Sequence, residues 1–261
     1  MKFFPAAVVI SLLITLGARA EMTNALSEAE IKGRQLAQQL VDQPPEQNLT
    51  TTGVMKIRPD EGDWFSVPIV CRVMLTPTNW ESLYQAGGTN QTQTLLVVHT
   101  AGRPNVYFYE TNRAGQVPIL NGMPMPGHWF KSPQKLTGGE TMTPFAGSDF
   151  WLCDLGLEFF HWPEQKVLPN PTSLKRGRSY TLLESTNSNP STNGYSRVLS
   201  WIDRETGGIL QAKAYDARGR LLKEFAPKSF KKVNGQWELQ EMEIDNDQTG
   251  SRTRLEFDLK K

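Results

Sequence analysis

The sequence predicts a mainly β (α+β) protein in which one large antiparallel sheet curls around a small amount of helix. Three observations predict this class. Short runs rich in β-branched and aromatic residues follow one another after residue 48, with Gly, Pro and Asn between them. One amphipathic helix with a well-marked start precedes these runs, at 27–41. A stretch dense in aromatic residues, 145–165, interrupts them and is too apolar to lie free in water.

The chain begins with a segment that has the features of a secretory signal peptide, residues 1–20. Lys2 gives it a positive start, the run AAVVISLLITL is too short to span a membrane, and the tripeptide at 18–20 is a small-x-small cleavage site. Cleavage there leaves Glu21, and not a lipid-modified Cys, at the new N-terminus. We therefore expect a soluble periplasmic protein in which 21–261 form a single domain.

The charge balance excludes one class of partner. Lys and Arg number 28 against 27 Asp and Glu, and the formal net charge is +1. Removing the leader takes away Lys2 and Arg19 and leaves the two signs nearly balanced. Binding to nucleic acid needs a basic face that neutralises phosphates, so we expect no nucleic acid partner.

The chain has two cysteines, Cys71 and Cys153. In an oxidising compartment they could form a disulfide, which would close a long loop and add ~4–5 kcal/mol of stability on the chain-entropy model. They could equally remain two separate buried thiols that behave as small hydrophobes. The sequence leaves both alternatives open.

The first predicted element is the N-terminal helix. Ser27 is placed as its N-cap, and Glu30 completes an S-x-x-E capping box. Apolar and small residues then repeat at helical spacing until Pro44-Pro45 ends the helix. Its apolar stripe must cover another part of the protein, and we expect it to cover the concave apolar face of the sheet.

Strands are predicted in two groups. They occupy 50–58, 64–75, 94–100 and 105–110, and then 194–203, 208–216, 219–233, 236–245 and 251–259. Asn234-Gly235 is a strong two-residue hairpin signal. In the last strand Leu255 and Phe257 alternate with Arg254 and Glu256, which is typical of an antiparallel sheet with one apolar face. A sheet of about ten strands must curl.

The aromatic-rich stretch reads FAGSDFWLCDLGLEFFHWPEQ, and we expect it to form a short helical plug. Ser148 and Asp149 precede an apolar run as an N-cap does, so the helix is predicted over 149–155. Its large apolar side chains need burial or a ligand. A plug against a curled sheet can leave a cavity for an apolar ligand. The candidate residues for the wall of that cavity are Phe150, Trp151, Leu155, Phe159 and Trp162.

Two sets of side chains could bind a metal, and each also has a purely structural explanation. A zinc site would need His99, His128 and His161, which lie far apart in the sequence and could only converge through the fold. Met123, Met125 and His128 are soft donors of the kind that Cu(I) binds, but Met and Pro in this segment also suit an apolar flap. We expect no metal and no cofactor.

Catalysis has little support in the sequence. Asp154 and Glu158 would share one face of a continuous helix and could act as acid and base, but their spacing carries no specific signature. The G-x-S-x-G, H-E-x-x-H, Walker-loop and C-x-x-C motifs are missing from the sequence. We therefore expect a protein that is not an enzyme.

Several segments resemble the outer membrane lipoprotein-sorting family, the LolA-like carriers of Gram-negative and related bacteria. They are GSDFWLCDLGLEFFHWPEQKVL, LKRGRSYTLLES, YSRVLSWIDRETGGILQAKAYDARGRLLKEF, KSFKKVNGQWELQEMEIDN and GSRTRLEFDL. The resemblance implies an incomplete antiparallel β-barrel around helices, with an interior that holds acyl chains. It implies a periplasmic carrier of lipoprotein or lipid acyl chains for outer-membrane sorting, with a membrane-bound donor or acceptor protein as a partner.

Two other hypotheses belong to different classes of protein. The same scaffold could serve as an envelope-stress sensor or interaction module, which would contact a membrane regulator and need no lipid cargo. A metal-dependent hydrolase built on the histidines or carboxylates is the third hypothesis.

Overall fold

The computed structural model of the chain describes residues 26–87, 91–113, 119–120, 123–124, 133–233 and 235–259. The signal peptide predicted at 1–20 lies outside these residues, as do Met125, His128 and the side chain of Met123, on which the copper alternative depends. In the part of the chain that the structure describes, no helix is long and apolar enough to cross a membrane.

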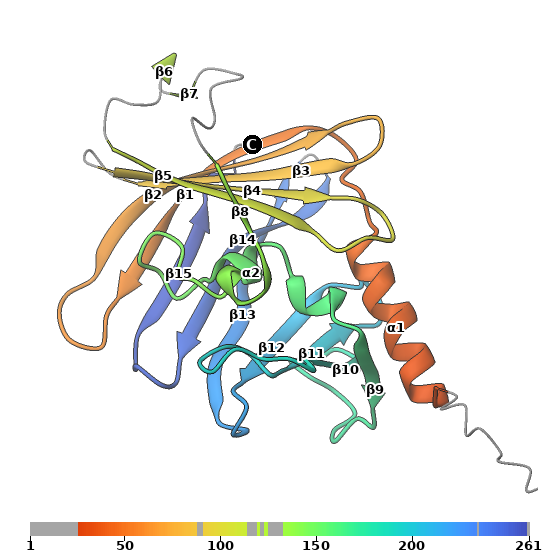
Figure 1. The fold of residues 1–261 in the computed structure, drawn as a ribbon. Helices are drawn as coiled ribbons and strands as arrows, with labels where there is room; N and C mark the ends of the chain where they lie inside the picture. Colours follow the sequence, from red (N-terminus) through yellow and green to blue (C-terminus); the bar gives the residue numbers. More distant parts are fainter. Residues whose placement is uncertain are drawn as a thin grey trace, which may run out of the picture.

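Thirteen strands form one antiparallel sheet in the order β8-β5-β4-β3-β2-β1-β15-β14-β13-β12-β11-β10-β9 (Figure 1). Its first arm contains β1 (Leu49–Arg58), β2 (Phe65–Leu75), β3 (Trp80–Gly87), β4 (Gln91–His99), β5 (Val106–Arg113) and β8 (Gln134–Leu136). Its second arm contains β9 (Glu164–Leu168), β10 (Tyr180–Thr186), β11 (Arg197–Asp203), β12 (Ile209–Tyr215), β13 (Leu221–Val233), β14 (Gln236–Asn246) and β15 (Arg252–Phe257). A separate pair is formed by β6 (Ile119–Leu120) and β7 (Met123–Pro124).

The two arms are joined by antiparallel pairing of β1 with β15, while β8 and β9 are the two edges of the sheet. The sheet is therefore curled but not closed, and the predicted incomplete barrel is confirmed. All nine predicted strands are present, and β3, β8, β9 and β10 are additional. The sequence of β3, WESLYQAG, has a weak strand pattern, and its pairing along its length with β2 and β4 defines it.

Helix α1 (Glu28–Val41) begins as predicted. The Ser27 hydroxyl accepts a hydrogen bond from the Glu30 amide at 3.3 Å, and the Glu30 carboxylate accepts one from the Ser27 amide at 2.7 Å. The helix lies along β9, so it covers the concave face only at that end of the sheet (Figure 1). Gly33 permits this close approach, because a Cβ there would lie 2.6 Å from the Gln165 carbonyl oxygen.

The remaining helical segments are short: η1 (Gly138–Thr141), α2 (Leu152–Leu155) and η2 (Glu158–His161). The predicted helix over 149–155 was wrong at its start, because the N-cap is Trp151 and not Ser148 or Asp149. The Asp154 carboxylate accepts the Trp151 amide at 2.8 Å. The chain then turns at Leu157, whose φ of 51° ends the helix. As a result, Asp154 and Glu158 do not lie on one continuous helix.

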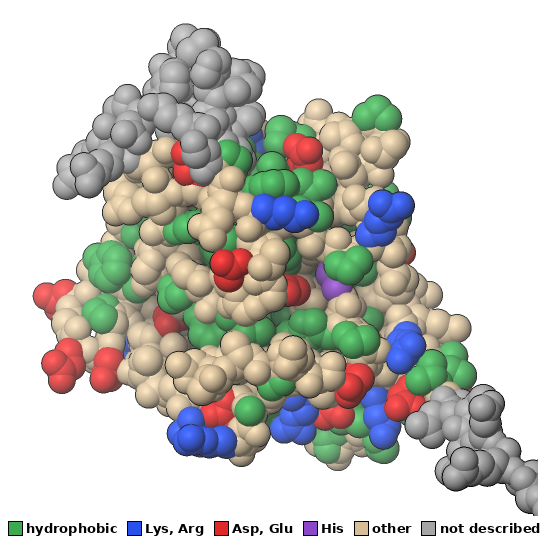
Figure 2. Space-filling view, in the orientation of Figure 1, with side chains coloured by type: hydrophobic (Ala, Val, Ile, Leu, Met, Phe, Trp, Pro, Cys, Tyr) green, Lys and Arg blue, Asp and Glu red, His purple; other side chains and the backbone are tan. Residues whose placement is uncertain are grey.

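Residues 145–162, which we call the plug, lie inside the curl of the sheet and join two parts of the core (Figure 1). One core cluster packs plug residues against β1–β5, β14 and β15, and it contains Phe145, Phe150, Leu152 and Leu155. The other packs the plug against α1 and β10–β12, and it contains Cys153, Phe159 and Phe160. Hydrophobic side chains are visible across the middle of the face in Figure 2, with most Lys and Arg side chains nearer its margins.

Candidate functional site: an apolar cavity between plug and sheet

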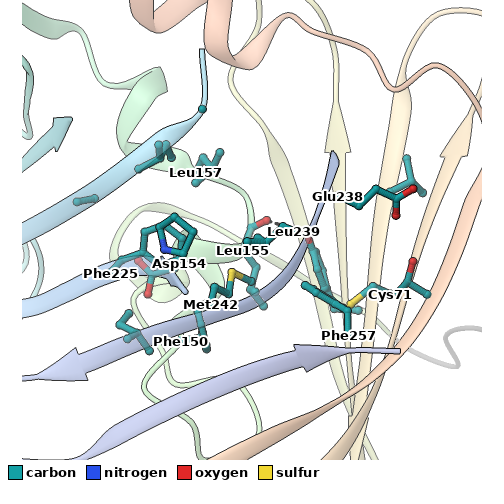
Figure 3. Close-up of a pocket in the computed structure, with 18 of the residues that line it drawn as sticks. Cys71, Phe150, Asp154, Leu155, Leu157, Phe225, Glu238, Leu239, Met242 and Phe257 are labelled. Carbon is teal, nitrogen blue, oxygen red and sulfur yellow. Dashed lines mark hydrogen bonds between the residues drawn. The ribbon is translucent and has the colours of Figure 1, made fainter. Parts of the chain in front are cut away.

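A cavity of about 730 Å³ lies between the plug and the concave face of the sheet (Figure 3). Most of its wall is aliphatic or aromatic. The second arm contributes Val198, Ile209, Ala212, Ala214, Phe225, Leu239, Met242, Ile244 and Phe257, and the first arm contributes Leu49, Thr51, Cys71, Val73 and Tyr84. Its volume is within the ~300–1,000 Å³ typical of small-molecule sites.

Three of the five predicted wall residues line this cavity: Phe150, Leu155 and Phe159. Trp151 and Trp162 are not among the lining residues. Trp151 stacks on Tyr195 with ring centroids 4.5 Å apart, and Trp162 packs its ring against Phe159 at 6.4 Å. A role of any of these side chains in holding a ligand stays a prediction.

The plug also lines the cavity with Leu157, whose backbone is in the left-handed region at φ 51°. A non-glycine residue other than Asn or Asp is uncommon in this conformation and stores local strain. The neighbouring Gly156 cannot be replaced easily either, because a Cβ there would lie 2.3 Å from the Tyr107 hydroxyl. The turn at 156–157 is thus fixed by packing and points Leu157 toward the cavity (Figure 3).

One side of the plug is bound to β13 by a buried charged group that sequence analysis missed. Lys223 is 2% exposed, its Nζ donates to the carbonyl oxygen of Asp149 at 2.7 Å, and it lies 3.5 Å from the centre of the Trp151 ring. Its ion pair with Asp154 is looser, at 3.8 Å. Burial lowers the pKa of Lys223 to about 8 and raises that of Asp154.

A second polar attachment joins the plug to β15 and to the turn before it. The Asp149 carboxylate accepts hydrogen bonds from the Thr253 hydroxyl at 2.8 Å and the Ser251 hydroxyl at 2.5 Å. The Asp149 amide donates to the Thr253 hydroxyl at 2.9 Å. Asp149 is therefore a tertiary anchor and not a helix cap. Lys223 and Asp154 reach the cavity wall, but their polar atoms already have partners within the protein.

The zinc alternative depends on three histidines, of which the structure describes His99 and His161. His99, on β4, stacks on Trp80 with centroids 5.2 Å apart, and its Nε2 lies 3.1 Å from the Ser82 hydroxyl. Burial, with a smaller contribution from His161, lowers the pKa of His99 to about 4. Within the described residues, no group of three or more His, Cys, Asp and Glu side chains could hold a metal ion.

Cys71 and Cys153 are both free thiols in the structure, which therefore has two separate thiols and not a disulfide between them. Cys71 lies on β2 and lines the cavity, whereas Cys153 lies in α2 and packs with the second core cluster. Burial raises the pKa of Cys71 to about 12 and that of Cys153 well above its usual range. Both therefore act as small hydrophobic side chains.

The open 13-stranded sheet with helical segments inside its curl is a LolA-like fold, and solved structures share it. A candidate outer membrane lipoprotein-sorting protein domain from Vibrio parahaemolyticus is 17% identical with a TM-score of 0.64, over 88% of this chain and 92% of that one. A DUF1329 family protein from Desulfovibrio piger is 18% identical with a TM-score of 0.63, over the same shares. A LolA superfamily protein from Nitrosomonas europaea is 16% identical with a TM-score of 0.56, over 87% and 92%.

A family model described as "-like: Uncharacterized protein" matches residues 129–260. This match covers just over half of the chain, and the chain belongs to that family. It includes the whole plug and all strands of the second arm. A search of curated proteins gave no match.

Proposed function

We propose that this protein is a carrier that binds the acyl chains of lipoproteins or free lipids in the cavity between plug and sheet. The observation that carries the proposal is the cavity of about 730 Å³, walled mainly by aliphatic and aromatic side chains. A LolA-like fold supports it, because structures with this fold include a candidate lipoprotein-sorting domain.

Acyl chains suit such a wall on energetic grounds. Each methylene group moved from water into the cavity contributes about 0.8 kcal/mol, so one long chain gains large affinity without specific polar contacts. Four charged residues reach the wall, Glu46, Asp154, Lys223 and Glu238. Lys223 and Asp154 are already satisfied by Asp149 and Tyr195, and the ligand does not need to pair with them. We infer a binding role and no catalytic step.

The cellular setting follows from the same proposal. The leader predicted at 1–20 would deliver 21–261 to the periplasm as one soluble lipid-binding domain. A carrier there must receive its cargo at one membrane and release it at another, so we propose a membrane-bound donor or acceptor protein as its partner.

The direct test is a titration of the purified protein with a dansyl-labelled fatty acid, followed by fluorescence. Leu239 is half-buried and lines the cavity, and Leu239→Glu should weaken binding at least tenfold because it adds a charge to an apolar wall. Leu210 is also a half-buried strand leucine, but it packs against the cluster around Trp201. The matched control Leu210→Glu should bind as the wild type does. Equal loss in both variants, or no binding by the wild type, would refute the proposal.

A further inference from the structure

Two hairpins of the sheet expose large aromatic side chains. On the β13–β14 hairpin Phe230 is 54% exposed and Trp237 is 71% exposed. On the β1–β2 hairpin Trp64 is 47% exposed and Phe65 is 46% exposed. A contiguous exposed apolar patch can mark a surface that contacts another molecule, whereas isolated exposed aromatic residues are common. The two hairpins differ in both position and charge.

The β13–β14 hairpin lies at the mouth of the cavity. Phe230 pairs with Leu239 across the two strands, and both residues line the cavity. Lys232 and Trp237 are the next pair on the same face, two residues closer to the tip. The apolar wall therefore continues outward along the hairpin from Leu239 through Phe230 to Trp237. Leu49 lines the cavity from β1 and is also 45% exposed.

Charge distinguishes the two hairpins further. Residues 228–239 contain three lysines and one glutamate, whereas 58–65 contain one arginine, two aspartates and one glutamate. Lys228 pairs with Glu243 at 2.6 Å, Lys231 donates to the Leu259 carbonyl oxygen at 2.5 Å, and Lys232 is exposed beside Trp237. Aromatic side chains with neighbouring lysines fit the interface of an anionic bilayer, and an acidic hairpin is repelled by it.

We propose that the β13–β14 hairpin docks the mouth of the cavity on an anionic phospholipid bilayer. Phe230 and Trp237 enter the interfacial region, and Lys232, on the same face of the hairpin, faces the lipid phosphates. This inference goes beyond acyl binding, because docking depends on the exposed hairpin and needs no cargo in the cavity. It gives an acyl chain a path from the bilayer into the cavity that stays on apolar side chains.

The test is flotation of the purified mature chain with vesicles of phosphatidylethanolamine and phosphatidylglycerol, and with vesicles of phosphatidylcholine alone. We expect the wild type to bind the anionic vesicles. Trp237→Ser should lower the partition constant about tenfold through lost interfacial burial. Lys232→Gln should lower it about fivefold, on anionic vesicles only. The matched control Trp64→Ser, on the acidic hairpin, should bind as the wild type does.

Trp237 is so exposed that its substitution should leave folding intact, which an unchanged melting temperature would check. The proposal would be overturned if the wild type failed to float, or if Trp237→Ser and Trp64→Ser lost binding equally. It would also be overturned if the protein bound only to membranes that contain protein. The dansyl fatty acid separates this outcome from failure of the carrier proposal. Trp237→Ser should retain probe binding in solution, since Trp237 does not line the cavity.

Discussion

The side of the plug that faces β13–β15 and the side that faces the cavity use different chemistry. Toward the strands, Asp149 and Asp154 form hydrogen bonds and a buried ion pair whose partners include Thr253 and Lys223. Toward the cavity the plug presents Phe150, Leu155, Leu157 and Phe159. Polar contacts with strict geometry fix the plug in position on one side. The other side presents an apolar surface, and the carrier proposal assigns this surface to the ligand.

The largest expected effect is loss of the polar anchor by Lys223→Met. Removing this cation leaves the Asp154 carboxylate buried without its charge partner, and the Asp149 carbonyl loses its donor. We expect the free energy of unfolding to fall by about 3 kcal/mol or more, measured by denaturant unfolding.

The double variant Lys223→Met/Asp154→Asn controls for this interpretation. Asparagine removes the unpaired charge, so the double variant should recover part of the stability that the single variant loses. If the double variant loses as much stability as Lys223→Met and Asp154→Asn lose separately, added together, the pair does not act as a unit. The polar contacts would then not distinguish this side of the plug from other packed surfaces.

A change on the cavity side should lower stability only slightly but should weaken ligand binding. Leu157→Asn keeps a side chain that tolerates the left-handed backbone at this position, so we expect a loss of stability below about 1.5 kcal/mol. The polar amide in the cavity wall should weaken binding of the dansyl fatty acid severalfold. If Leu157→Asn destabilised the fold as much as Lys223→Met, the division between the two sides would fail.

The pH dependence of stability tests whether His99 is buried beside the plug. Burial lowers its pKa, and the nearby His161 lowers it further. Because the pKa of His99 falls to about 4, only the unfolded chain binds this proton between about pH 6.5 and pH 4. The free energy of unfolding should therefore decrease as the pH falls through this window.

His99→Phe keeps a ring against Trp80 and removes this titration. Its stability should fall less than that of the wild type between pH 7 and pH 4, by on the order of 2 kcal/mol. Urea unfolding at both pH values measures the difference. If the free energy of unfolding changed equally with pH in the two proteins, burial would not perturb the titration of His99.

The smallest effect concerns thiol reactivity. Burial raises the pKa of Cys71 to about 12 and that of Cys153 well above its usual range, so both thiols should react very slowly with Ellman's reagent in the folded protein. In denaturant, without a reductant, two thiols per chain should react with the reagent because the structure has no disulfide between them. No reactive thiol in denaturant would instead indicate a disulfide.

Local patterns in the sequence predicted the parts of the fold that local forces determine. The capping box of Ser27 and Glu30, the hairpin signal at 234–235 and the alternation around Leu255 each correspond to an observed element. Asp149 shows where this approach stops. Its cap-like position in the sequence was misleading, because the partners that use its carboxylate, Ser251 and Thr253, lie a hundred residues later in the chain.

The cavity wall was predicted only in part, because the contacts that define it are also distant in the sequence. Aromatic density identified the plug, but it could not tell Phe159, which lines the cavity, from Trp151, whose ring packs on Tyr195 and Lys223. A signal for Lys223 did exist, since it stands two residues before Phe225 and strand alternation places both on one face. The sheet residues of the wall could have been found in the same way.

Native mass spectrometry of the mature protein, purified from the periplasm without detergent, tests the carrier proposal most directly. We expect adducts of defined mass that extract as phospholipid, free fatty acid or acylated peptide, and we expect Leu239→Glu to lose them while Leu210→Glu retains them. A wild-type protein that is free of adducts and stays free after incubation with lipid would contradict the proposal that the cavity between plug and sheet holds acyl chains.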